Sequence, residues 1–463
     1  MYYSKFDSPL YMIMTVVNAT DINHTNLPIK KRKWSARTLF VLGMLVLVSF
    51  GALATNPIVQ PDAIKAPMLP KPLSLVQKFY ILNKEKLYWF SSPERANRAG
   101  EWLAEIITAE KDGIIPNHLH IGKLRAELDN KKIVEDSLYR MRFDWQISAL
   151  ILTYIRTLQQ GNIRFKYDEI SVSHDSVYCD ELLNMKTTES VVQMVKRLEC
   201  KDSTYQVLRN FLRDSISITD SIKYRTVQIA MNYRRYLSFN HQSEYILVNI
   251  PEMEASYYRN DSLKVRMRTV VGKILTPTPV MASYITDVVT FPNWNVPHSI
   301  AVKEILPKVK RTANYLEQHS LEVVDSKGTV IEDADLKWKS YTARNFPYFF
   351  RQSTGAGNTL GVLKFNMHNP FSIFLHATSS QSVFGKTDRF LSHGCIRLQK
   401  PFELAKNLLR GEIDMEQLRQ GKTNTKTNRL KPVQKIATFI IYMPLKVKGN
   451  SVVFLPDPYQ LIK

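Results

Sequence analysis

The spacing of apolar positions divides the chain into a helical half and a β-rich half. In the first half, apolar residues recur at the spacing of one helical face from Phe143 to Leu158, and Gly161 ends this helix. Residues 92–94 (Ser-Pro-Glu) are typical of a helix start, with a capping hydroxyl, a proline in the first turn and an acid near the positive end. The pattern predicts a mostly α-helical scaffold domain over residues 73–240.

The pattern changes near Tyr245, where strands begin. The segment YILVNI, a turn at residues 259–261 and then LKVRMRTVV predict a β-hairpin. Residues 371–376 alternate, which places His376 on the face opposite the apolar residues of its strand. Prolines and glycines interrupt the chain throughout this half, as is typical of short strands.

The second half is predicted to form one mainly β domain over residues 241–463. Within it, residues 300–344 are more helical and charged and predict an insertion. A short helix is expected over 401–409, with proline in its first turn, and the last strands over 437–442 and 451–454. The expected fold class is therefore α+β, with a helical domain ahead of the β domain.

The first 72 residues predict targeting to a membrane. Residues 1–37 end in a basic run, and residues 38–54 are uncharged and mostly apolar. Cations on the N-terminal side of such a segment hold that end in the cytoplasm, so the rest of the chain is expected outside it. Residues 38–54 are either an uncleaved inner-membrane anchor or a signal peptide cleaved after Ala54. The proline-rich residues 55–72 predict a linker.

The charge is strongly basic, with 63 Lys and Arg against 42 Asp and Glu and a net charge of +21. Such a charge needs a polyanionic or acidic partner. The basic residues are spread along the chain, and there is no zinc-finger spacing, basic heptad helix or aromatic RNA-binding signature. We therefore expect no nucleic-acid partner. A carboxylate-rich, phosphate-rich cell envelope would explain a spread-out charge equally well, and charge alone does not decide the partner.

Three cysteines are present, Cys179, Cys200 and Cys395. In an exported protein, Cys179 and Cys200 could form a disulfide, and the alternative is two unpaired, half-buried thiols. Either way, Cys395 stands apart from the other two.

Residues 392–397 read Ser-His-Gly-Cys-Ile-Arg and carry the sharpest chemical signal. Gly394 leaves room for a substrate carbonyl to approach the thiol of Cys395. A nearby imidazole or guanidinium, here His393 and Arg397, lowers a thiol pKa and so favours the reactive thiolate. A lone cysteine is more often a buried structural residue, but an inert thiol does not need these polar and cationic neighbours.

A thiol nucleophile needs a base, and two histidines are near in sequence. His393 lies two residues from Cys395 and would point to the same side of an extended strand. His376 ends a different strand, which suits a base that reaches across a cleft to the thiol. From the local sequence alone, a surface histidine at the end of a strand is an equally good interpretation. Two histidines and a cysteine could also bind zinc, but without CxxC, HExxH or a fourth ligand we expect no metal and no cofactor.

These residues resemble the L,D-transpeptidase catalytic domain. The resemblance rests on His376, Thr378, the motif SHGCIRL ending at Leu398, and a Pro-x-Glu-Leu-Ala helix at residues 401–405. It extends over roughly residues 75–460, and FPNWNVP with other elements resembles the large multidomain subgroup. Papain-like cysteine proteases place the cysteine before the histidine, the reverse of the order here. The subgroup usually carries a peptidoglycan-binding module, for which this chain has no room between scaffold and catalytic domain.

The resemblance implies a role for each site residue. Cys395 would be the nucleophile and His376 the base, with the backbone carbonyl of Ala377 orienting its ring. The backbone amides around Gly394 and Cys395 would hold the oxyanion. His393 would have a supporting role.

Two further features follow from the same resemblance. Arg397 would contribute to site architecture and electrostatics. Residues 300–344 would form a capping subdomain over the cleft, a lid.

The implied activity is acyl transfer on peptidoglycan stem peptides. The enzyme would cleave the bond before the terminal D-alanine of a tetrapeptide stem and form 3→3 cross-links, a role in cell-wall organisation and cell shape, and carbapenems would acylate it. With water as acceptor it would be an L,D-carboxypeptidase. The competing classes are a non-catalytic wall-binding scaffold protein and a zinc hydrolase.

Overall fold

The computed structural model describes residues 73–463 except 173, 187, 216–219, 356, 412, 421–425 and 463. The predicted membrane segment 38–54 and linker 55–72 lie outside the described residues. Within the described part of the chain, no helix is both long enough and apolar enough for a membrane span.

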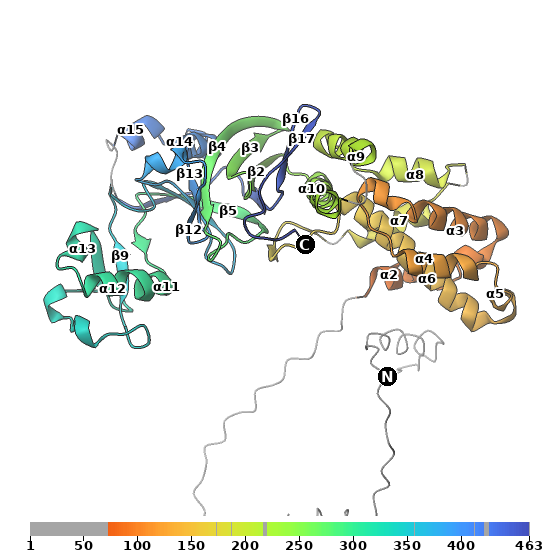
Figure 1. The fold of residues 1–463 in the computed structure, drawn as a ribbon, viewed down its shortest axis with the longest axis horizontal. Helices are drawn as coiled ribbons and strands as arrows, with labels where there is room; N and C mark the ends of the chain where they lie inside the picture. Colours follow the sequence, from red (N-terminus) through yellow and green to blue (C-terminus); the bar gives the residue numbers. More distant parts are fainter. Residues whose placement is uncertain are drawn as a thin grey trace, which may run out of the picture. The chain divides into compact units, whose positions relative to one another are not determined.

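Helices make up most of the described chain from Leu73 to Phe239, as predicted (Figure 1). The longer ones are α2 (Leu75–Leu82), α3 (Pro93–Ile106), α4 (His118–Glu127), α6 (Ser137–Gln160), α7 (Asp175–Leu183), α8 (Val191–Leu198), α9 (Ser203–Ser215) and α10 (Ser221–Phe239). Short helical turns complete the region: Trp89–Ser91, Ala109–Asp112 and α5 (Lys132–Glu135).

The helix boundaries follow the predicted signals. Helix α3 begins at Pro93, and the Ser92 hydroxyl accepts the amide of Arg95 at its N-terminus. Helix α6 ends at Gly161, whose φ of 76° is strained for any residue with a side chain. These signals are local, which is why the sequence alone predicts them.

A buried carboxylate organises the helical core. Asp144 on α6 accepts the hydroxyl of Tyr80 and the amides of Tyr88, Trp89 and Phe90, the amides at 3.0, 2.8 and 3.0 Å. Burial raises the pKa of Asp144, and these donors act in the opposite direction by stabilising its charged form. The contacts fasten the chain after α2 onto the longest helix of the domain.

The β half forms a sheet that closes on itself. Its order is β5-β10-β11-β13-β4-β3-β2-β15, and β15 returns to pair with β5, while β1, β12 and β14 add at the sides. The strands are β1 (Tyr167–Asp168), β2 (Glu244–Asn249), β3 (Glu254–Arg259), β4 (Ser262–Gly272), β5 (Met281–Thr290), β10 (Leu363–Met367), β11 (Leu375–His376), β12 (Phe390–Ser392), β13 (Ile396–Leu398), β14 (Asn428–Leu430) and β15 (Ile436–Ile441). Closure leaves the main strands without a free edge.

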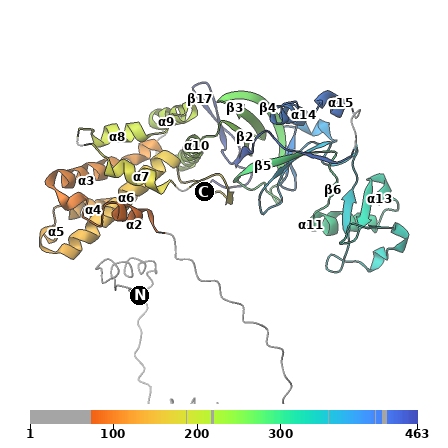
Figure 2. The same cartoon turned by 180° about the vertical axis from the view of Figure 1, so that it is seen from behind.

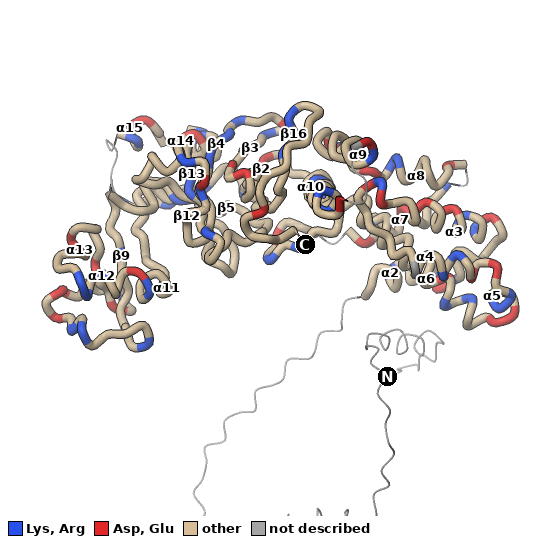
Figure 3. The backbone as a smooth tube through the Cα atoms, viewed as in Figure 1, with Lys and Arg blue, Asp and Glu red and all other residues tan. Residues whose placement is uncertain are grey.

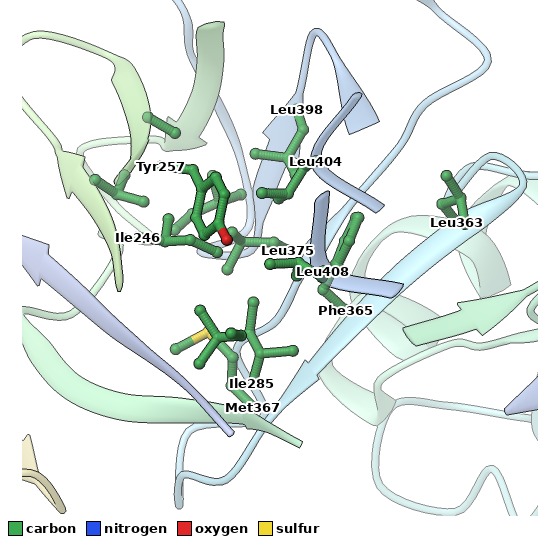
Figure 4. Packing of buried hydrophobic residues seen from close by; sticks show 14 of the residues in the cluster. Ile246, Tyr257, Ile285, Leu363, Phe365, Met367, Leu375, Leu398, Leu404 and Leu408 are labelled. Atoms are coloured by element: carbon green, nitrogen blue, oxygen red, sulfur yellow. The ribbon is translucent and has the colours of Figure 1, made fainter. Parts of the chain in front are cut away.

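Side chains from all around this sheet meet in one hydrophobic core (Figure 4). Tyr257, Ile285, Phe365 and Leu375 point into it, and Leu404 covers it from helix α14 (Pro401–Leu409). Each such side chain contributes roughly 1.5–3 kcal/mol when removed from water. Helix α15 (Met415–Arg419) and the hairpin of β16 (Leu445–Lys448) and β17 (Ser451–Phe454) complete this half.

The helical half and the sheet share a second core. Strand β1 comes from the helical half but pairs in parallel with β5, with Tyr167 opposite Met281. Tyr236 of α10 packs edge-on against Phe439 of β15, with ring centroids 6.1 Å apart. Figure 2 shows α9 and α10 next to β17 and β2 from the opposite side. The scaffold is thus built onto the sheet that carries the site.

Two strand predictions were wrong in detail. The turn at Asn260-Asp261 joins β3 to β4, so YILVNI pairs with the intervening strand EASYYR and the predicted hairpin is a three-stranded meander. Strand β11 contains only Leu375 and His376, because the Asn369 side chain bonds the main chain of residues 371 and 373 and holds them in a turn. His376 is therefore buried among its neighbours.

The insertion is a small subdomain with its own core. It contains β6 (Trp294–Asn295), α11 (His298–Ile300), a π-helical turn (Ala301–Ile305), α12 (Leu306–Val309), α13 (Tyr315–Gln318), β7 (Leu321–Val324), β8 (Val330–Ile331) and β9 (Phe349–Gln352). Its sheet has the order β6-β9-β7-β8. Strands β6 and β9, which pair with each other, lie outside the predicted limits 300–344.

The suggested disulfide is not present. Cys179 and Cys200 are free, buried thiols in separate cores, Cys179 among the scaffold helices and Cys200 between α9, α10 and the sheet. Each thiol donates to a different carbonyl, of Leu75 and of Arg234, both at 3.8 Å. Proximity in sequence did not bring them together because α8 lies between them.

Candidate active site

Cys395 lies directly before β13, next to the strand that carries His376. Strands β11 and β13 run in parallel, with His376 opposite Arg397 and Leu375 opposite Ile396. The amide of Ile396 donates to the carbonyl of Phe374 at 3.1 Å, which continues this pairing up to the cysteine. The sheet thus brings together three of the predicted site residues: Cys395, His376 and Arg397.

The loop before Cys395 is held by hydroxyl groups. The Ser392 hydroxyl donates to the carbonyl of Cys395 at 2.6 Å and accepts the amide of Gly394 at 3.1 Å. The Thr278 hydroxyl donates to the carbonyl of Gly394 at 2.8 Å and accepts the amide of Gly272 at 2.9 Å. Ser392 and Thr278 are buried, so these bonds fix the loop from inside the protein.

Gly394 fits this loop for two reasons. Its φ is 115°, which side chains rarely permit, and a Cβ there would lie 3.0 Å from the Ile373 side chain. Its amide, one of the two expected oxyanion donors, is bonded to Ser392. The amide of Cys395 bonds to none of the described residues and so remains available as a donor.

The thiol is neutral in this environment. Burial raises the pKa of Cys395 to about 11, although the main chain of Phe374 and the charges of Lys364 and Arg397 all act to lower it. The thiol donates to the carbonyl of Ser372 at 3.7 Å. A thiolate must therefore be generated at the moment of reaction.

The imidazole of His376 is neutral too. Burial, with Arg397 and Lys364 nearby, lowers the pKa of His376 to about 3, and the main chains of Ala377 and Leu360 act to raise it. Ala377 therefore influences the ring, but Nδ1 forms no hydrogen bond with any described residue. A neutral, buried imidazole has a free nitrogen lone pair and can accept a proton.

Two cations flank the pair, and the sequence singled out only Arg397. The guanidinium of Arg397 has a pKa lowered by burial, and its Nε has no hydrogen-bond partner among the described residues. Lys364 on β10 faces His376 across the sheet register, and its Nζ lies 4.2 Å from the centroid of the Phe374 ring. Burial lowers the pKa of Lys364, while the nearby thiol of Cys395 acts to raise it.

His393 is not directed at the thiol by any bond seen here. Its Nε2 lies 2.5 Å from a carboxylate oxygen of Glu304, in the π-helical turn of the insertion. Glu304 is 89 residues away in sequence, so local patterns do not reveal it. The contact joins the insertion to the loop that carries the nucleophile.

Comparison with known proteins finds two domain matches in this chain. Residues 243–425 match the L,D-transpeptidase catalytic domain, and residues 74–212 match a scaffold domain. A protein of Haemophilus influenzae named as a candidate L,D-transpeptidase is 33% identical over 243 residues, which are 50% of this chain and 48% of that protein. The match thus spans about half the length of this relative.

Solved structures show weaker similarity. An L,D-transpeptidase of Enterococcus faecium aligns with a TM-score of 0.21 at 12% identity, over 44% of this chain and 51% of that one. One from Mycobacterium smegmatis aligns with a TM-score of 0.22 at 10% identity, over 43% and 58%. These similarities are too low to support a conclusion about this chain.

The family matches define a catalytic domain behind a helical scaffold domain. The chain carries an L,D-transpeptidase catalytic domain preceded by a scaffold domain, which confirms the resemblance seen in the sequence. The residues between the two matches, 213–242, consist mainly of α10, whose side chains belong to the core shared with the sheet.

Proposed function

We propose that this chain transfers the acyl group of a peptidoglycan tetrapeptide stem to an amine of a neighbouring stem. The observation that carries the proposal is the pairing of β11 with β13 inside the matched domain, which sets His376 beside the strand that follows Cys395. The donor carbonyl is the one that joins the third stem residue to the terminal D-alanine. The product is a 3→3 cross-link.

The first step forms a thioester. Because both groups are neutral, His376 takes the proton of Cys395 as the sulfur attacks the carbonyl carbon. The amide of Cys395 donates to the oxyanion, and the charges of Lys364 and Arg397 stabilise the developing negative charge. The C–N bond then breaks, and the imidazolium returns its proton to the departing D-alanine amine.

The second step releases the acyl group. An amine of another stem attacks the thioester, His376 accepts its extra proton, and the sulfur leaves and takes up a proton to restore the thiol. With water as acceptor, the same steps give a carboxypeptidase and a free tripeptide stem. The nature of the acceptor therefore decides between cross-linking and trimming.

The test is intact-mass spectrometry of the full chain with a carbapenem, next to Cys395→Ala. We expect the native chain to gain the mass of one carbapenem and the variant to gain none. Incubation with disaccharide-tetrapeptide then distinguishes a cross-linked dimer from a tripeptide product. A folded native chain that forms neither adduct nor product would refute the proposal and favour a non-catalytic wall-binding protein.

A location outside the cytoplasm is part of the proposal, since peptidoglycan stems are there. It rests on the sequence of residues 38–54, for which we propose an inner-membrane anchor or a signal peptide. Cell fractionation with N-terminal sequencing of the mature chain tests it. A full-length chain in the cytosolic fraction would contradict it.

A further inference from the structure

The helical half contains a cleft with a volume of about 1060 Å³. Helices α6 and α10 form two of its walls, and the segments around residues 114–117 and 162–164 form its rim. None of its lining residues belongs to the nucleophile loop or to β11. Its volume lies just above the range of roughly 300–1,000 Å³ typical of sites that bind small ligands.

Three arginines give the cleft its charge. Arg156, Arg164 and Arg225 line it, and all three are exposed. No aspartate or glutamate lines the cleft, and none of the three arginines forms an ion pair with a described carboxylate. Several other arginines of the scaffold are paired, as Arg209 is with Asp112. Lys and Arg are also spread over the rest of the described chain (Figure 3), so the charge of the cleft is distinguished by the lack of acids.

The remaining lining is mostly apolar, with a few amides and the hydroxyl groups of Thr153, Tyr154 and Thr157. Isoleucine and leucine side chains supply most of it: Ile106, Ile114, Ile121, Leu150, Ile163 and Ile229. A mixed lining of this kind suits a ligand that carries carboxylates on a chain with small apolar side chains. Guanidinium groups bind carboxylates in a bidentate manner, which adds both energy and orientation.

The arginines sit on a fixed framework. Gly161, with φ of 76°, lies so close to α10 that a Cβ there would be 2.7 Å from the carbonyl oxygen of Asn232. The amide of Asn162 donates to the Asn232 side chain at 3.3 Å, and that side chain in turn donates to the carbonyl of Gln228 at 2.9 Å. The segment with Arg164 is thereby fastened to the helix with Arg225. A ligand would meet a preformed site and order little of the protein on binding.

We propose that this cleft binds the acidic stem peptide of peptidoglycan as a second site, separate from Cys395. The proposal rests on the proposed function, since it takes the polymer to be the substrate. Stem peptides carry carboxylates next to alanine methyl groups, which matches both the arginines and the apolar lining. The 30 residues between the two matches, 213–242, are too few for a separate wall-binding domain, and α10 takes up Ser221–Phe239 of them. A peptidoglycan strand bound at the cleft would present its other stem peptides to Cys395 at a raised effective concentration.

The experiment measures binding of soluble disaccharide-tetrapeptide to the full chain in non-ionic detergent, by titration calorimetry. Cys395→Ala is present throughout, so that no turnover occurs. The test variant changes Arg156, Arg164 and Arg225 to Gln, and the matched control changes three exposed, unpaired cations outside the cleft to Gln: Arg125, Lys131 and Lys264. We expect the test variant to bind about tenfold more weakly or worse, and the control to bind as the parent does.

Equal binding by the test and control variants would overturn the proposal. So would a test variant that keeps stem binding but loses binding to phosphatidylglycerol vesicles, which would assign the arginines to a lipid surface. Carbapenem acylation is also measured in the chain that has the three arginine substitutions and the native Cys395. This measurement distinguishes failure of the cleft proposal from failure of the catalytic proposal. We expect acylation to be unchanged, because the cleft shares no residue with the nucleophile loop.

Discussion

Thr278 offers a sharp test of how the nucleophile loop is held. Its hydroxyl is buried and bonds both the carbonyl of Gly394 and the amide of Gly272, at 2.8 and 2.9 Å. The substitution Thr278→Val keeps the shape but removes both bonds and leaves two buried main-chain groups unsatisfied. Each lost bond costs about 1–1.5 kcal/mol, so the free energy of unfolding should fall by about 2–3 kcal/mol.

The loop should also lose its alignment. Gly394 directly precedes Cys395, so a freed carbonyl lets the nucleophile move, and we expect carbapenem acylation to slow by about tenfold or more. Urea unfolding followed by tryptophan fluorescence measures the stability, and intact mass against time measures the acylation. Thr278→Ser, which keeps the hydroxyl, should lose less than about 1 kcal/mol and react at nearly the native rate.

Thr387→Val is the matched control, because Thr387 is exposed and its hydroxyl makes no hydrogen bond to the described residues. It should change the free energy of unfolding by no more than about 0.5 kcal/mol. If Thr278→Val behaves like Thr387→Val in both assays, the hydroxyl does not hold the loop and the reasoning is refuted.

Four other substitutions or conditions test the site and its support. Because the pKa of Cys395 is raised to about 11, alkylation of its thiol by iodoacetamide should become about tenfold faster per pH unit from about pH 7 to 10. An alkylation rate that stops rising near neutral pH would contradict this. Lys364→Met should raise the pKa of Cys395 further and slow alkylation about threefold to tenfold at fixed pH, while Lys364→Arg should react at nearly the native rate. An unchanged rate in Lys364→Met would show that the charge of Lys364 does not influence the pKa of the thiol. Glu304→Ala should make His393 react faster with diethylpyrocarbonate, as mapped by mass spectrometry, and should change the free energy of unfolding by less than about 1 kcal/mol. Unchanged labelling would mean that the contact between His393 and Glu304 does not persist in solution. Asp144→Ala should lower the free energy of unfolding, measured in urea, by about 3–5 kcal/mol, because three main-chain amides and a hydroxyl lose their hydrogen-bond acceptor. A loss below about 1 kcal/mol would contradict the role given to Asp144.

Signals confined to a few residues predicted structure well. The start of α3 at Pro93, the end of α6 at Gly161 and the helix Pro401–Leu409 all rest on caps and prolines that act within one turn. The strand EASYYR was missed because its mixture of polar and apolar residues shows no clear period-two pattern. Its pairing with both β2 and β4 defines it as a strand. Strand β11 was predicted too long because the side chain of Asn369, two to four residues away, competes for the main chain.

The sequence named the residue types of the proposed site but not their environment. Cys395 and His376 were singled out by their motif, and the sequence placed His376 on the face opposite the apolar residues of its strand, whereas it is buried. Lys364 was missed, because a single lysine in a strand carries no signal until sheet register sets it opposite His376. The buried positions on either side of it, Leu363 and Phe365, place Lys364 on the opposite face of β10, and this alternation was the one available hint.

The closure of the sheet has a consequence for how the enzyme is made. Strand β5 is synthesised about 150 residues before β15, its partner at the closing seam. The Tyr459 hydroxyl, made later still, accepts the amide of Thr278 at 3.2 Å and donates to the carbonyl of Gly272 at 2.6 Å. Long-range pairings of this kind form slowly and only once both partners exist. A growing chain therefore has its thiol before it has the framework that holds the thiol, and this framework is complete only once Tyr459 has been made.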